Sequence, residues 1–145
     1  KIMKKTLTGL SLILKDSNKP YHLFVITSTV SPKTCEEELI PLVEEVSGRE
    51  LNKGFGMCYN PEFIALGNVV DDTLQPDFVL IGESDTKAGD ILEGIYKKMT
   101  ENNPEMARMS LVSAEITKIS LNAFVTMKIS FANTLANICE KIKGQ

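Results

Sequence analysis

Two short polar segments of this chain carry side chains that could bind a cofactor or move a proton. Ser28-Thr29 follows one short apolar run, and Asn60-Pro61-Glu62 follows another. Ligands of open parallel sheets sit beyond the carboxyl ends of the strands, where hydroxyls can order a water molecule and a partly desolvated Glu62 can act as a base. The simpler interpretation is that the hydroxyls begin a turn and that Glu62 caps a short helix. Spacing alone favours this simpler interpretation.

A second group of polar residues lies near the start of a predicted long helix. Glu115, Lys118 and Asn122 are spaced i, i+3 and i+7, so they share one helix face. A cation beside an amide could hold a developing alkoxide, with Lys118 supplying charge and Asn122 direction. The commoner outcome of such spacing is an ordinary surface ion pair between Glu115 and Lys118.

The elements that must position these residues alternate between helices and strands. Apolar residues at helical spacing predict a first helix over residues 3–14. Nearly continuous apolar runs predict strands at residues 22–27, 55–59 and 78–81, of the kind that is covered on both faces. Strands that alternate with amphipathic helices, without tight hairpin signals, indicate right-handed crossovers and a parallel sheet.

Capping residues predict where the helices between these strands begin. Thr34-x-x-Glu37 can form a capping box for a helix that ends at Gly48. Pro41 lies inside that helix and should kink it or set a later start, because proline removes a backbone donor. Ser84 or Asp85 is expected to cap the helix that Asn102-Asn103-Pro104 ends.

The last part of the chain is predicted to be one long helix. Neither Gly nor Pro occurs from Ser113 to about Ile142, a span of roughly 30 residues and about 45 Å as a helix. Its middle has apolar residues on more than one face, so a second subunit or a second domain is expected to cover it. Lys128 and the scattered Asn, Ser and Thr residues argue against a membrane span.

Composition narrows the classes of partner. The chain has 145 residues, 16 of them basic and 19 acidic, and no basic stripe forms that would grip nucleic acid. Cys35, Cys58 and Cys139 are far apart and odd in number, which indicates neither disulfides nor a zinc site. We expect a cytoplasmic protein. The sequence starts without Met and directly in a helical pattern, so we also expect the protein to begin further upstream.

Taken together, these segments resemble the UDP-glucose/GDP-mannose dehydrogenase family, from about His22 to Lys141. Each segment alone is a weak signal, but their order and separations are specific. The matching segments are Ser28-Thr29-Val30, Tyr59-Asn60-Pro61-Glu62-Phe63 with Gly67, Pro76-Asp77-Phe78-Val79-Leu80-Ile81-Gly82, Glu115-x-x-Lys118-x-x-x-Asn122-Ala123-Phe124, and Lys128-Ile129-Ser130-Phe131-Ala132-Asn133.

The resemblance implies an activity and a role for several residues. Such enzymes use two NAD molecules in turn to oxidise a nucleotide sugar's primary alcohol to an acid, through a cysteine thioester that water cleaves. Thr29, with Ser28 and Val30, would contact NAD, and Thr29 would help to order water. Glu62 would be the base in hydrolysis, Lys118 would stabilise the oxyanion and Asn122 would help to place it. The implied substrate contacts are Glu62, Phe63, Ile64, Leu66, Lys118 and Asn122.

The resemblance also implies a fold and a division of the chain. We expect an α/β fold, the second half of a Rossmann-like parallel sheet with flanking helices, followed by a long central dimerisation helix. Residues 1–112 would be the C-terminal half of the NAD-binding domain, and residues 113–145 the helix of a homodimer.

Three departures from the family pattern bear on activity. No G-x-G-x-x-G loop precedes the first helix, and no cysteine lies in a Gly-rich loop, so this chain alone is expected to be inactive. Leu66 stands where the family often has a second carboxylate, so the identity of the sugar is left open.

Two alternatives remain. The β-hydroxyacid dehydrogenases also place a Lys and an Asn one turn apart on a long helix after a Rossmann domain, but they transfer one hydride and do not need the Pro-Glu-Phe segment. The other alternative is a non-catalytic assembly module, in which the long helix dimerises and the half-sheet supports it. Binding of NAD and dimerisation would separate these possibilities.

Overall fold

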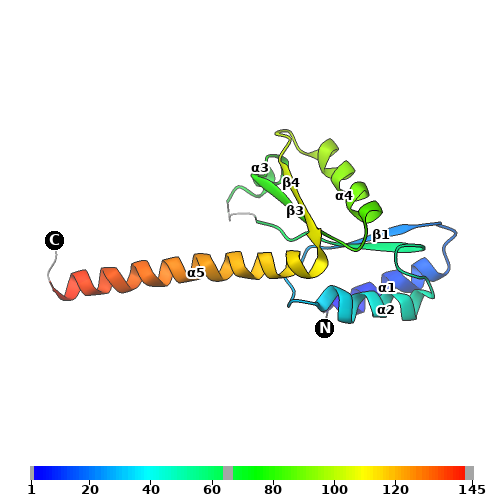
Figure 1. Cartoon of the computed structure of the whole chain (residues 1–145), viewed down its shortest axis with the longest axis horizontal. Coiled ribbons are helices and arrows are strands. Elements are labelled where there is room, and N and C mark those ends of the chain that lie inside the picture. The colour runs from blue at the N-terminus through cyan, green and yellow to red at the C-terminus, as the bar shows by residue number, and fades with distance from the viewer. Residues whose placement is uncertain (1, 64–66, 143–145) are drawn as a thin grey trace.

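A four-stranded sheet with helices on both faces forms the body of the molecule, and one long helix projects from it (Figure 1). The computed structural model describes residues 2–63 and 67–142. The helices α1, α2 and α5 contribute to the core on one face of the sheet, and α4 packs on the other. In chain order the elements are α1 (Ile2–Lys15), β1 (His22–Ile26), the π-helical turn η1 (Cys35–Leu39), α2 (Ile40–Ser47), β2 (Phe55–Tyr59), α3 (Val69–Leu74), β3 (Phe78–Glu83), α4 (Thr86–Met99), β4 (Glu105–Ser110) and α5 (Leu111–Lys141).

The strands lie in the order β1-β2-β3-β4, with two parallel pairs. β1 pairs with β2 in parallel, and β3 pairs with β4 in parallel. Between the two pairs, β2 and β3 run antiparallel through Cys58 with Glu83 and Tyr59 with Gly82. The α/β class and the strands over β1, β2 and β3 are confirmed.

The prediction of a fully parallel sheet is wrong for the β2–β3 pair. A parallel connection needs a long crossover, usually a helix that packs its apolar side on the sheet. The connection from β2 to β3 contains α3, which has only six residues and buries none of them. The chain therefore turns back, and β3 enters the sheet from the opposite end.

Helix boundaries follow the predicted capping residues in all but one case. Asp85 accepts a hydrogen bond from the Ala88 N–H at 2.9 Å and caps α4. Gly48 ends α2 in the left-handed conformation, and Pro41 lies in the first turn of α2, after the π-helical turn η1. The predicted capping box is wrong, because the Thr34 side chain makes no capping hydrogen bond.

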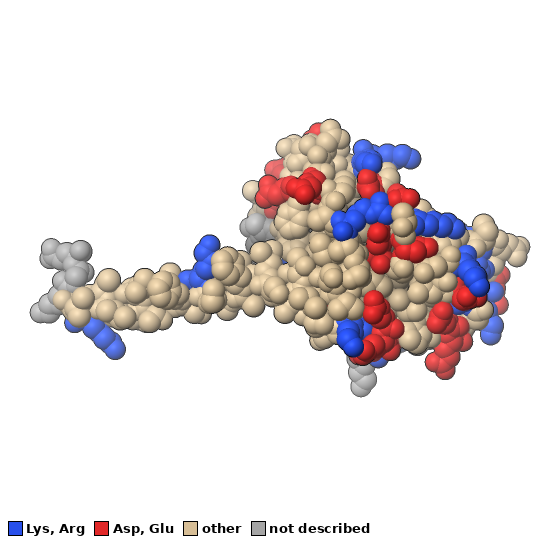
Figure 2. Space-filling model, in the orientation of Figure 1, with Lys and Arg blue, Asp and Glu red and all other residues tan. Residues whose placement is uncertain are grey.

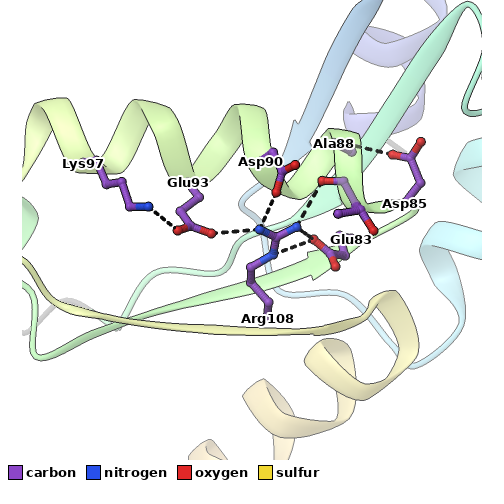
Figure 3. Close-up of polar contacts among 8 residues, drawn as sticks. Glu83, Asp85, Ala88, Asp90, Glu93, Lys97 and Arg108 are labelled. Atoms are coloured by element: carbon purple, nitrogen blue, oxygen red, sulfur yellow. Dashed lines mark hydrogen bonds and ion pairs between the residues drawn. The ribbon is translucent and has the colours of Figure 1, made fainter.

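An ion-pair cluster fixes α4 against β3 and β4 (Figure 3). The guanidinium of Arg108, on β4, lies 2.7 Å from Glu83, 2.6 Å from Asp90 and 2.8 Å from Glu93. These carboxylates raise the pKa of Arg108, against the effect of burial. The strand that leads into α5 is thereby joined to the helix on the opposite face of the sheet.

Helix α5 has two segments with different surroundings. Residues 111–118, the anchored segment, contain all four of its buried residues, Leu111, Ala114, Glu115 and Lys118. At Gly82 a Cβ atom would lie 2.8 Å from the Ala114 Cβ, so the absence of a side chain there lets α5 approach β3 closely. Residues 119–141, the exposed segment, are all exposed. Across residues 2–63 and 67–142, no helix is long and apolar enough to cross a membrane.

Candidate active site at the end of the parallel strand pair

The polar loops after β1 and β2 leave the sheet at the same edge. In the parallel register Ile26 is opposite Tyr59, and the Asn60 N–H donates to the Ile26 carbonyl at 2.8 Å. Thr29 and Glu62 each follow these paired residues by three positions. Both loops follow strands of the parallel β1–β2 pair. The antiparallel pairing of β2 with β3 therefore does not alter the edge at which the two loops lie.

In the loop after β1, a buried residue follows two exposed hydroxyl groups. The side chain of Val30 is 8% exposed and belongs to the core. Ser28 and Thr29 are exposed. A buried anchor next to accessible hydroxyls fits a loop that hydrogen-bonds a ligand at the carboxyl end of a parallel strand.

Lys118, from the anchored segment of α5, reaches the loop after β2. Its Nζ donates to the carbonyl oxygen of Glu62 at 2.5 Å and lies 4.3 Å from the centre of the Phe63 ring. The residue is 9% exposed, and burial lowers the pKa of Lys118 from its usual value, although the Glu62 carboxylate acts in the opposite direction. A residue distant in sequence therefore places a partly desolvated cation beside Glu62.

The remaining predicted substrate contacts differ in their surroundings. The Glu62 side chain is exposed, and Asn122 is exposed one turn beyond Lys118 on α5. Phe63 is half-buried, 4.8 Å from the Phe78 ring centre. Ile64 and Leu66 lie outside the residues that the structure describes.

Glu115 has a different environment from the surface ion pair considered above, and that alternative is wrong. Its side chain is fully buried, at 0% exposure. One carboxylate oxygen accepts from the Lys33 N–H at 2.5 Å, and the other accepts from the Cys35 N–H at 2.9 Å. Spacing along α5 could not reveal these contacts, because the partners are backbone groups about 80 residues away in sequence.

Asn60 fixes the start of the loop that carries Glu62. Its Nδ2 donates to the Leu80 carbonyl at 2.9 Å, and its Oδ1 accepts from the Tyr96 hydroxyl at 2.6 Å. Burial raises the pKa of Tyr96, although the hydrogen bond to Asn60 acts against that rise. Beside these residues is a hollow of about 310 Å³, which Glu62 and Phe63 also line.

Two of the three cysteines are buried thiols, and the described residues form no cluster suited to a metal ion. Cys35 and Cys58 are fully buried, and burial raises the pKa of both thiols, that of Cys58 to about 12. Cys139 is exposed near the far end of α5. Over residues 2–63 and 67–142, no group of three or more His, Cys, Asp or Glu side chains is arranged to hold a metal ion.

Comparison with protein families places this geometry in context. Residues 3–100 match the NAD binding domain of the UDP-glucose/GDP-mannose dehydrogenase family, and residues 112–144 match its central domain. The chain belongs to this family. The resemblance inferred from the motifs is thereby confirmed, and NAD is the cofactor after which the matched domain is named.

Individual relatives and solved structures agree. The chain is 39% identical to the UDP-glucose 6-dehydrogenase of Haloferax volcanii over 93% of its own length and 31% of that protein. It is 33% identical to the GDP-mannose 6-dehydrogenase of Pseudomonas putida over 90% of the chain and 29% of that protein. A crystal structure of a ternary complex of GDP-mannose dehydrogenase from Pseudomonas aeruginosa superposes with a TM-score of 0.89 at 30% identity, over 97% of this chain and 31% of that one. The chain therefore spans less than a third of the length of these relatives.

Proposed function

We propose that this chain supplies part of the active site of an NAD-dependent nucleotide-sugar dehydrogenase, which oxidises the C6 primary alcohol of the sugar to a carboxylate. The oxidation proceeds by two hydride transfers through a cysteine thioester, and the cysteine lies outside this chain. The single observation that best supports this proposal is the contact between Lys118 and the Glu62 carbonyl at 2.5 Å. This contact joins Lys118, to which we assign the stabilisation of the substrate oxygen, to Glu62, to which we assign the role of hydrolytic base. The family match supports both assignments.

Lys118 stabilises negative charge on the substrate oxygen. A cation that is already partly desolvated stabilises a nearby anion more strongly than one in water, and it needs no reorganisation during the reaction. Burial holds Lys118 in this state. Asn122, one turn further along α5, adds an amide donor that helps to position the same oxygen.

The loop residues Ser28, Thr29 and Val30 contact the dinucleotide, and Glu62 acts on water. NAD, when bound, accepts the hydride in each oxidation. The exposed hydroxyls of Ser28 and Thr29 supply hydrogen bonds at the cofactor edge, and Thr29 also orders the water that cleaves the thioester. The exposed Glu62 carboxylate takes a proton from that water. Phe63, Ile64 and Leu66 complete the sugar-nucleotide contacts.

The domain division and the oligomer belong to the same proposal. We assign residues 1–112 to the C-terminal half of the NAD-binding domain and residues 113–145 to the central dimerisation segment of a cytoplasmic homodimer. Phe124, Phe131 and Ile138 recur at seven-residue intervals and are 53%, 66% and 49% exposed, and such a repeat is the spacing of a helix seam that packs against another helix. On the visible face this part of α5 is almost free of charge (Figure 2).

The test uses the full-length protein with NAD and with UDP-glucose or GDP-mannose as the substrate. We expect one of these sugars to yield its acid with two NADH formed per acid. The Glu62→Gln variant is expected to accumulate enzyme covalently bound to the sugar nucleotide, detected by intact mass, because the thioester forms but is not hydrolysed.

The matched control is Glu45→Gln, which makes the same chemical change at an exposed glutamate of α2. It should turn over like the wild type. One NADH per product would contradict the double oxidation, and normal release of acid by Glu62→Gln would remove Glu62 as the base.

A further inference from the structure

We propose that Glu115 is a positioning residue, which joins the loop of Ser28 and Thr29 to the turn of α5 that carries Lys118. This inference rests on the proposed function for its effect on catalysis. Its structural part stands on the contacts of Glu115 alone. Glu115 touches neither substrate nor cofactor in this scheme and acts through the loop it holds.

The hydrogen bonds of Glu115 account for its burial. A carboxylate at 0% exposure is costly unless its oxygens accept hydrogen bonds. Both oxygens do so, from the backbone N–H groups of Lys33 and Cys35 at 2.5 Å and 2.9 Å. Hydrogen bonds to an ionised acceptor are roughly twice as strong as neutral ones. The contact is therefore a specific attachment of this loop to α5.

Local backbone hydrogen bonds support this loop, but no side chain of its own segment caps the start of η1. Lys33 is a non-glycine residue with φ of 71°, a conformation uncommon for such residues. Thr34, at the N-cap position of η1, provides no side-chain cap. The Glu115 carboxylate takes the place of that missing cap, and it lies where the exposed N–H groups of a helical start favour a negative charge. A distant residue thus holds the segment that local sequence leaves uncapped.

One turn of α5 therefore holds both loops of the candidate site. Glu115 binds the loop after β1, and Lys118, three residues later, binds the loop after β2 through the Glu62 carbonyl. The spacing of these two side chains along the helix sets the position of the loop after β1 relative to the loop after β2. Release of one contact should displace one loop and leave the other in place.

The first test measures steady-state kinetics of full-length Glu115→Gln. The amide replaces one acceptor oxygen with a donor, so one of the two backbone N–H groups loses its partner. We expect the KM for NAD to rise about tenfold, while the KM for the sugar nucleotide stays within about twofold. Glu115→Asp keeps the charge on a shorter side chain and should show a smaller rise in the KM for NAD.

The control is Glu140→Gln, which makes the same chemical change at an exposed position of the same helix. Its kinetic constants should equal those of the wild type. Equal rises in both KM values for Glu115→Gln, or no rise in the KM for NAD, would overturn the positioning role.

The second test is hydrogen exchange at the backbone amides of Lys33 and Cys35, which requires no activity. Both amides should be protected in the wild type, and their exchange should accelerate about tenfold or more in Glu115→Gln, with Val25 in β1 unchanged. Unprotected amides in the wild type would overturn the attachment even if no Glu115 variant folds. A wild type without dehydrogenase activity would sink the proposed function, and the exchange data would still decide whether Glu115 holds the loop.

Discussion

The two segments of α5 reverse the usual distribution of residue types. The anchored segment buries two charged residues, Glu115 and Lys118, beside small or aliphatic ones. The exposed segment leaves large apolar side chains such as Phe124 and Phe131 in contact with solvent. Buried charges are expensive, and large exposed apolar surfaces mark interaction sites. The reversal fits two tasks for α5, the observed attachment to the loops of the sheet and the proposed contact with a second subunit.

The largest expected effect tests the task of the anchored segment. In the full-length enzyme, Lys118→Ala should lower the turnover number by about 10²–10³-fold, because the charge on the substrate oxygen grows towards the transition state. The KM for the sugar should change much less. Lys98→Ala, at an exposed position of α4, is the matched control and should leave turnover within about twofold. A turnover number that Lys118→Ala leaves unchanged would remove Lys118 from the mechanism.

The next effect tests the exposed segment. Phe131→Asp should raise the dimer dissociation constant by about a hundredfold, because a charge would be buried in the helix seam. Light scattering after size exclusion measures this change. Asn133→Asp places the same charge on the opposite side of the helix, at about 100° per residue, and should leave the dimer intact. Equal dissociation of both variants would show that the seam does not run along Phe131.

A smaller effect concerns the close approach of α5 to β3. Gly82→Ala would put a Cβ 2.8 Å from the Ala114 Cβ and 3.2 Å from the Leu111 Cα. Such overpacking should reduce the free energy of unfolding by about 1–3 kcal/mol in urea denaturation. The control Gly94→Ala meets nothing within 4 Å in α4 and should increase stability by about 0.5–1 kcal/mol. Opposite signs are the decisive result.

The smallest effect concerns acid stability at the ion-pair cluster between α4 and β4. Lys97 and then Arg108 lower the pKa of Glu93 from its usual value of 4.5. A carboxylate whose pKa is lowered in the folded state adds stability above its unfolded pKa, and this contribution disappears as the pH falls through the folded pKa. Between roughly pH 6 and pH 3, the wild type should therefore lose more stability than Arg108→Gln. Lys98→Gln should follow the wild type, and identical pH curves for all three proteins would argue against the cluster.

Local patterns predicted most of the elements and missed the ones that depend on distant pairing. The apolar runs of β1 and β2 and the cap at Asp85 are visible in short windows. β4 has the sequence EMARMS, which lacks β-branched and aromatic residues, and it is a strand because it pairs with β3 along its whole length. The antiparallel direction of β3 was missed because no short sequence window shows that α3 buries none of its residues against the sheet.

The candidate site shows the same limit. Spacing placed Lys118 on a helix face, and family motifs connected it with Glu62, but neither indicated that Lys118 contacts the Glu62 carbonyl. The contacts of Glu115 were missed because backbone N–H groups carry no sequence signature. The catalytic roles of Thr29, Glu62, Lys118 and Asn122 stay predictions, and the kinetic variants described above test those of Glu62 and Lys118.

The uninterrupted backbone of α5 has a mechanical consequence. Its 31 residues include neither Gly nor Pro, the residues at which sharp bends most often occur, so the helix behaves as a stiff lever pivoted where Ala114 meets Gly82. A subunit bound to the exposed segment would then fix the orientation of the anchored segment. It would thereby also fix the positions of the loops after β1 and β2. Dilution of such an enzyme to monomers should cost catalytic rate as well as quaternary structure.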